Sequence, residues 1–248
     1  MDFSAGTRKG RMPDENLILR DLSGLLLERL KPRLRVQNLV PGQVLFAAGD
    51  TISNIYFPRS GAVSLVCELA GGQMIETAMV GHEGVIGGCA ALDDRGALHR
   101  AIVQIGGSGF ALDAETARQA ARESDDFRRT IIRHEQLVLA QAQQSAACNA
   151  SHSLNERLAR WLLHTRDVLG ADSLLLTQEF MAEMLGVRRT SVSIVAHGLQ
   201  QAGLISYRRG HVKIENAGAL QSSACECYAA VRMRYSTPKT SALEASPL

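Results

Sequence analysis

The chain has 248 residues, which exceeds a typical single domain and leaves room for two domains that each bury a core. Hydrophobic residues make up 46% and charged residues 21% of the sequence, an ordinary globular composition that excludes a disordered chain. No apolar run approaches the roughly 20 residues that a membrane-spanning helix needs. Because the net charge is only +2, a nucleic-acid partner has to be argued from where the positive charge is concentrated.

Residues 1–16 are polar and aperiodic, and we expect a flexible arm there. Acidic residues interrupt this segment and no apolar stretch follows, so the sequence predicts no signal peptide and a cytoplasmic protein. The cysteines are odd in number and widely scattered, which argues against a disulfide framework and predicts reduced thiols. They are Cys67, Cys89, Cys148, Cys225 and Cys227.

An apolar helix is predicted from about Leu17 to Pro32, and the pattern then changes. From Val36 to Leu112, glycine-rich turn signals recur mostly 7 to 12 residues apart, with short β-prone runs between them. Many short strands at this spacing indicate a β-sandwich or barrel.

A long helix is predicted after Ala114, because no glycine or proline occurs between Asp125 and Cys148. Within it a stripe of residues repeats with alternating steps of four and three, as in a coiled coil. The stripe consists of Phe127, Ile131, His134, Val138, Gln141, Ser145 and Cys148. This pattern favours a dimer helix whose stripe faces a second copy. The alternative is that the stripe packs on the chain's own N-terminal domain.

The segment from Leu176 to Ile214 predicts a helix-turn-helix. Thr177 is a good N-cap for the first helix, and Gly186 permits the tight turn before the second. In such motifs the start of the second helix enters the major groove of DNA. The predicted exposed residues at that start are suited to bases and phosphates. They are Arg188, Arg189, Thr190, Ser191 and Ser193.

A β-hairpin is predicted after Gly203, with Arg208 and Arg209 at its tip. From Met184 to Ile214 there are five lysine or arginine residues and no aspartate or glutamate. Binding of the DNA backbone explains this asymmetry. The alternative is that these are ordinary solvated arginines on a small helical domain.

The run from Thr177 to Val192, together with Leu199 to Ile205, closely resembles the helix-turn-helix signature of the Crp/Fnr superfamily of transcription regulators. The resemblance extends from about Leu17 to Tyr228. It implies an α+β protein with a jelly-roll-like β-roll sensor of the cyclic-nucleotide-binding type, a dimerisation helix and a C-terminal winged helix-turn-helix. The corresponding boundaries are 17–116, 117–150 and 151–228, followed by a tail at 229–248.

The resemblance also implies a homodimer that binds a palindromic site on double-stranded DNA and contacts RNA polymerase. Thr177 and Gln178 join the predicted DNA-binding residues, and Arg189 matches the family's main guanine-reading arginine. Two positions depart from the best-known members. Thr190 stands where a glutamate reads a base, and Ile194 stands where a second arginine often lies, so the resemblance does not determine the target sequence.

A cyclic-nucleotide site of this family needs backbone N–H groups and an arginine for the phosphate, and a glutamate for the ribose. The glycine-rich segment is present, but Gly88 follows Gly87 where the glutamate is expected, and His99-Arg100 replaces an Arg-Ser pair. We therefore expect no family-type binding of cyclic AMP. Gly87, Gly88, His99 and Arg100 remain candidate residues for an unknown small-molecule effector.

No metal site and no cofactor are predicted. The family's iron–sulfur members carry clustered N-terminal cysteines, whereas the first cysteine here is Cys67. Cys225 and Cys227 form a close pair, but two thiols fill only half of a zinc tetrahedron. Buried, unreactive thiols are the expectation.

Two other functions remain open. One is an enzyme that uses Glu83 and His99 near the glycine-rich loop, although the sequence has no Ser-His-Asp set, P-loop or Rossmann fingerprint. The other is an accessory protein that responds to a cyclic nucleotide without binding DNA.

Overall fold

A computed structural model describes residues 15–236 of the chain, and the remaining terminal residues lie outside this range. Within it, no helix has the length and apolar character needed to cross a membrane. The N-terminal part contains helices α1 (Leu17–Arg20), α2 (Gly24–Leu30), η1 (Lys31–Arg33) and η2 (Gly88–Ala91) and strands β1 (Arg35–Leu39), β2 (Val44–Phe46), β3 (Asn54–Pro58), β4 (Ala62–Glu68), β5 (Met74–Val80), β6 (Arg100–Ile105) and β7 (Gly107–Asp113). The C-terminal part contains α3 (Ala114–Glu123), α4 (Asp125–Ser151), α5 (Leu154–Leu169), β8 (Ser173–Leu175), α6 (Gln178–Leu185), α7 (Arg189–Gln201), β9 (Ile205–Arg208), β10 (His211–Ile214), α8 (Ala217–Ser222) and α9 (Cys227–Ser236).

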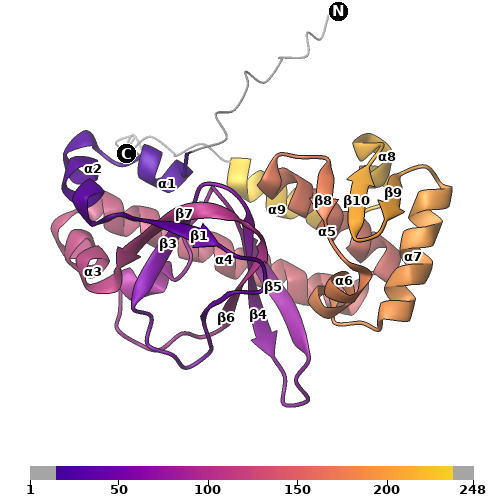
Figure 1. Cartoon of the computed structure of the whole chain (residues 1–248), viewed down its shortest axis with the longest axis horizontal. Coiled ribbons are helices and arrows are strands. Elements are labelled where there is room, and N and C mark those ends of the chain that lie inside the picture. The colour runs from indigo at the N-terminus through magenta and orange to yellow at the C-terminus, as the bar shows by residue number, and fades with distance from the viewer. Residues whose placement is uncertain (1–14, 237–248) are drawn as a thin grey trace, which may run out of the picture.

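The predicted β-sandwich is present as two antiparallel sheets (Figure 1). One sheet has the strand order β1-β7-β3 and the other β2-β6-β4-β5. Fully buried side chains such as Ile55, Phe57 and Leu112 fill the core of this β-roll, and Phe127 and Ile131 of α4 complete it. The short β-prone runs that predicted strands therefore pack around one core.

The N-terminal arm ends earlier than expected. Residues 1–14 lie outside the described range, but Asn16, which was assigned to the arm, is 1% exposed. Its side-chain oxygen caps α1 by accepting from the N–H groups of Ile18 and Leu19. Its amide nitrogen donates to the carbonyl oxygens of Pro58 and Gly84 at 2.9 and 2.8 Å. Asn16 is therefore an anchor of the sensor domain, because a buried amide requires hydrogen-bond partners.

The long helix is present, but its predicted stripe faces inward. The helical region is interrupted at Ser124, which caps α4, so the predicted boundary at residue 117 falls inside α3. Phe127, Ile131 and Cys148 are 0% exposed in the single chain. The stripe packs on the chain's own domains and cannot also contact a second copy, so the alternative left open by the sequence is the correct one for these residues.

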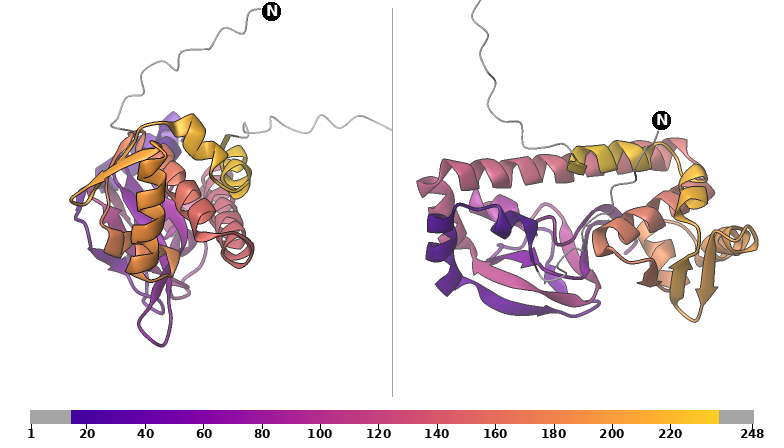
Figure 2. Two further views of the ribbon diagram at one scale, coloured as in Figure 1. Left: turned by 90° about the vertical axis from the view of Figure 1, so that its right-hand side faces the viewer. Right: turned by 90° about the horizontal axis from the view of Figure 1, so that it is seen from above.

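The C-terminal tail also begins later than expected. Residues 229–236, assigned to the tail, belong to α9, which lies alongside α4 (Figure 2). The side chain of Gln141 on α4 donates to the Tyr235 hydroxyl at 3.2 Å, and Arg234 donates to the carbonyl of Ala140 at 3.1 Å. The C-terminal domain is thus fixed to the long helix through α9.

The sensor domain and the helix-turn-helix domain share one apolar core. Val66 of β4 and Met79 of β5 are 0% exposed and pack in the same cluster as Trp161 of α5 and Leu185 of α6. The indole N–H of Trp161 donates to Glu76 Oε1 at 2.8 Å. The outer face of the sheet therefore holds the C-terminal helical domain in place.

Burial raises the pKa of Glu76 to about 7, although hydrogen bonds with Ser64 and Trp161 and the charge of Arg160 oppose this shift. The Ser64 hydroxyl has one proton and lies 2.5 Å from Glu76 Oε2 and 2.6 Å from Gln104 Oε1. Protonated Glu76 can donate to Ser64, which in turn donates to Gln104. The neutral carboxyl therefore satisfies this chain of hydrogen bonds within the sheet and still accepts from Trp161.

We expect Glu76→Gln to remove a pH-dependent loss of stability. Because the folded pKa lies above that of the unfolded chain, Glu76 stabilises the fold below pH 4.5 and loses this contribution as the pH rises through 7. The full shift corresponds to about 3 kcal/mol. Urea unfolding at about pH 5 and about pH 8 should therefore show the variant gaining stability over wild type as pH rises. Glu28→Gln, at an exposed site, is the control; an identical pH profile for Glu76→Gln and wild type would contradict the assignment.

Candidate nucleic-acid interface

The predicted helix-turn-helix is formed by α6, a turn at Gly186, and α7. The Thr177 hydroxyl caps α6 by accepting from the N–H of Phe180 at 3.1 Å. Gly186 has a φ of 65°, a left-handed conformation that other residues rarely adopt. A Cβ at Gly186 would also lie 3.0 Å from Cγ1 of Ile75 in β5. Glycine is required here both for the turn and for the contact with the sensor domain.

The first turn of α7 exposes the predicted DNA-binding residues. Arg188 is the N-cap, and Arg188, Arg189 and Thr190 are all exposed, with 64% of the Arg189 side chain accessible. No acidic residue lies in this turn, so the positive end of the helix dipole adds to the arginine charges. Ser191 is half-buried. Together these groups form a positively charged surface that suits phosphates and base edges.

Two predicted residues hold the motif together. Ser193 is half-buried, and its hydroxyl donates to the side-chain oxygen of Gln178 on α6. This bond ties the second helix to the first, which is a positioning role rather than an outward-facing one.

The wing is a two-residue hairpin between β9 and β10. Arg209 and Gly210 both have positive φ values, 49° and 80°, as a type I′ turn requires. Gly210 accepts from the N–H of Leu176 at 2.8 Å, and a Cβ on Gly210 would lie 3.6 Å from Thr177 Cγ2. The fold thus brings the exposed Arg208 and Arg209 beside the start of α6, although 30 residues separate them in the sequence.

Two further residues affect this surface and were not among the predicted site residues. Glu179 lies 3.7 Å from the Nε of Arg189, an exposed ion pair that partly neutralises the arginine. Ile194 is 74% exposed, one turn after Thr190 on the same face of α7. The resemblance had already singled out the position of Ile194, whereas the Glu179 contact depends on how α6 and α7 cross.

The glycine-rich loop of the sensor domain lies against protein side chains. Gly87, with a φ of 74°, is buried, and a Cβ there would lie 3.1 Å from both Ile52 and Phe46. A Cβ on Gly88 would lie 2.7 Å from Glu135 Oε1 of α4. The two glycines therefore allow close approach of apolar side chains and of the long helix.

Glu135 is the nearest acidic group to the start of η2. Its carboxylate accepts a backbone hydrogen bond from Cys89, and burial raises its pKa to about 7. The adjacent His134 is 3% exposed and bonds the N–H of Val85, and burial lowers its pKa to about 4. The N–H groups at the start of a helix can bind an anion. Here the carboxylate of Glu135 accepts the hydrogen bond from the N–H of Cys89.

His99 and Arg100 do not point to one site. The His99 ring packs against Phe46 in a tilted arrangement with centroids 5.8 Å apart, and burial lowers the pKa of His99. Arg100 donates to Glu68 Oε2 at 2.9 Å. His99 and Gly87 thus meet at Phe46, whereas Arg100 is engaged with the acidic end of β4.

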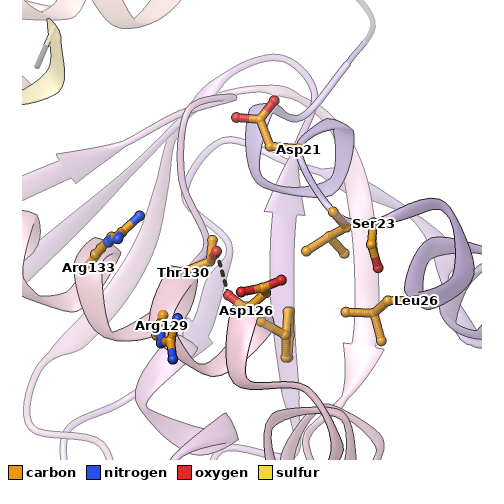
Figure 3. A pocket seen from close by; sticks show the side chains of 9 residues that line it. Asp21, Ser23, Leu26, Asp126, Arg129, Thr130 and Arg133 are labelled. Carbon is orange, nitrogen blue, oxygen red and sulfur yellow. Dashed lines mark hydrogen bonds between the residues drawn. The ribbon is translucent and has the colours of Figure 1, made fainter. Parts of the chain in front are cut away.

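A cavity of about 330 Å³ lies between the α1–α2 link and the start of α4 (Figure 3). Its lining carries charges of both signs, from Asp21 and Asp126 and from Arg129 and Arg133. None of the four predicted effector residues lines it. A group of four side chains able to bind a metal lies elsewhere, where α4 meets α5.

Comparisons with known proteins agree with this architecture. Residues 36–124 match the model of the cyclic nucleotide-binding domain, and residues 156–223 match that of the Crp-like helix-turn-helix domain. No curated protein matched the sequence.

Solved structures share the fold at low sequence identity. FixK2 from Bradyrhizobium japonicum has a TM-score of 0.67 and 17% identity, covering 77% of this chain and 98% of its own. The c-di-GMP responsive global regulator CLP from Xanthomonas campestris has a TM-score of 0.65 and 16% identity, covering 78% and 100%. The Crp/Fnr-family regulator TTHA1359 from Thermus thermophilus has a TM-score of 0.64 and 19% identity, covering 77% and 98%. With two family models that together span well over half of its residues, the chain belongs to the Crp/Fnr superfamily of transcription regulators.

Proposed function

We propose that the protein is a homodimeric regulator that inserts the start of α7 into the major groove of a two-fold symmetric DNA site. The observation that carries this proposal is the exposed basic edge formed by α7 and the wing. Family members are regulators and not enzymes, so the Glu83–His99 alternative has no support. The alternative of an accessory protein that does not bind DNA leaves the four exposed arginines of α7 and the wing unexplained.

The arginines have different proposed roles. Arg189 can donate to the O6 and N7 of guanine in a bidentate pair, and Ile194 can contact a thymine methyl group one turn later. Arg208 and Arg209 at the wing tip suit the flanking phosphates. The Arg189–Glu179 pair is exposed on both sides and contributes little, so DNA can displace it at small cost.

A different face of α4 is proposed for the dimer. Its exposed residues also repeat with alternating steps of three and four, and all of them lie on the outer surface. They are Arg129, Ile132, Gln136, Leu139, Gln143, Ala146 and Ala150. Ile132 and Leu139 are 39% and 58% exposed, and paired helices would bury them. A two-fold axis along α4 would present two α7 helices to one DNA face.

We infer that the sensor responds to something other than cyclic AMP bound in the family manner. Glu135 takes an N–H that a cyclic phosphate would need, and Phe46 and Ile52 lie against Gly87. His99 Nε2 has no hydrogen-bond partner within the described residues, which leaves one buried donor or acceptor for a different effector.

Selection of bound duplexes from a random pool tests the function directly. We expect an inverted repeat whose half-site centres lie about one helical turn apart, and binding that weakens log-linearly with salt. The proposal fails if the pure protein binds no duplex at low ionic strength, with or without cell extract.

Arg189→Ala should lower the affinity by about 1–3 kcal/mol per half-site and relax the preference at one base pair in each half-site. Arg208→Ala and Arg209→Gly should weaken all sequences alike, and each should reduce the salt slope by about one per half-site, or about two for the dimer. Glycine is chosen at 209 because of the positive φ. Fluorescence anisotropy at several salt concentrations measures both effects. Arg29→Ala is the matched control, because its side chain is also 64% exposed and ion-paired. Unchanged base discrimination in Arg189→Ala would refute its role.

The double variant Ile132→Asp, Leu139→Asp should dissociate the dimer, because paired helices would bury two unpaired carboxylates per chain. Sedimentation velocity should give a monomer, while circular dichroism remains that of the wild type. Leu25→Asp is the control, since Leu25 is 85% exposed on α2. A double variant that stays dimeric would rule out this face.

A further inference from the structure

Four side chains with metal-binding atoms converge at the end of the long helix. Cys148 lies in the last turn of α4, His152 caps that helix, and Cys225 and Cys227 flank the start of α9. Their sulfur and nitrogen atoms all lie within 4.8 Å of one another. The three cysteines are at most 5% exposed, and His152 is half-buried.

Two of the distances in this cluster are close to those around a single tetrahedral ion. Zinc–sulfur bonds of about 2.3 Å and zinc–nitrogen bonds of about 2.0–2.1 Å place two sulfurs about 3.8 Å apart and a sulfur and a nitrogen about 3.5 Å apart. Cys148 Sγ lies 3.5 Å from Cys225 Sγ, and Cys227 Sγ lies 3.7 Å from His152 Nδ1. We propose that Cys148, His152, Cys225 and Cys227 form a Cys3His site for one zinc ion.

Neighbouring groups are arranged as a zinc site requires. Metal-bound histidines usually donate their second ring N–H to a carboxylate, which fixes the ring. His152 Nε2 lies 3.2 Å from Glu226 Oε1, so Nδ1 is left to face the sulfurs. The Gln144 amide donates to Cys227 Sγ at 3.0 Å, as hydrogen bonds to thiolates do in such sites.

The positive charges around the cluster are also compatible with a zinc site that has three thiolate ligands. Three thiolates and one Zn²⁺ carry a net charge of −1, which is costly to bury without a cation nearby. Arg157 and Arg160 of α5 lie close enough to interact electrostatically with these thiols. Their Nε groups are buried without a hydrogen-bond partner among the described residues. Thiolates would supply the missing negative charge.

The site would join three parts of the fold. It links the end of α4, the bend before α5 and the connection from α8 to α9. Arg157 extends the link, because it donates to the carbonyl of Leu185 at the end of α6. A bound ion would therefore fix the helix-turn-helix relative to the dimer helix.

The first experiment measures metal in the full chain, purified without a polyhistidine tag or chelator. We expect about one zinc per chain by plasma mass spectrometry after dialysis. Replacement by Co²⁺ should give the visible bands of tetrahedral cobalt with thiolate ligands. Protein that holds no zinc and takes up neither ion overturns the proposal. So does iron with acid-labile sulfide, because the cluster would then be a different cofactor.

Variants identify the ligands. Cys225→Ser and Cys227→Ser should lose the zinc and the cobalt bands, whereas Cys67→Ser, at an exposed cysteine outside the cluster, should retain both. Glu226→Gln keeps all four ligands and should weaken zinc binding about tenfold, as the loss of a histidine's outer partner does. If a cysteine variant does not fold, zinc titrations of Glu226→Gln and Cys67→Ser still test the proposal. Zinc binding should weaken in Glu226→Gln and stay unchanged in Cys67→Ser, and equal affinities would contradict the site. Zinc retained in soluble Cys225→Ser and Cys227→Ser would rule out this ligand set.

Discussion

The packing of the outer sheet face against α5 and α6 is the contact on which the rest of the molecule depends. Val66 and Met79 of the sensor lie in one apolar core with Trp161, and Ile75 lies under the turn at Gly186. Because this core is close-packed, the helix-turn-helix cannot change its orientation without opening it. Any signal that reaches α7 from the β-roll has to pass through this contact or through α4.

The long helix contacts both domains through its inner face, while its outer face stays exposed. Its inner stripe completes the β-roll core at one end and meets α9 at the other. Its outer stripe has the same spacing and remains exposed. One helix can therefore hold the sensor, the DNA-binding domain and, in the proposed dimer, the partner chain. A change in the sensor that shifts α4 would alter the spacing of two recognition helices.

The β-roll has the fold of a cyclic nucleotide-binding domain, and side chains of the same chain lie against its glycine-rich loop. Glu135 reaches from α4 to the loop that follows Gly87, and Phe46 packs on the other side. A separate group of polar side chains lies at the far end of α4, where three cysteines and a histidine converge.

The sequence by itself determined the order of the domains, the helix-turn-helix and the arginine-tipped wing, because these depend on local signals: a capping threonine, a glycine with positive φ and short-range periodicity. It also identified Arg188, Arg189, Arg208 and Arg209 as exposed cations. Only the tertiary structure decided which face of α4 is buried, because a 3.5-residue repeat fits two stripes equally well and only the position of the β-roll distinguishes them. The same holds for the cysteine cluster, where Cys148 and Cys225 lie 77 residues apart and only the packing of α9 on α4 brings them together.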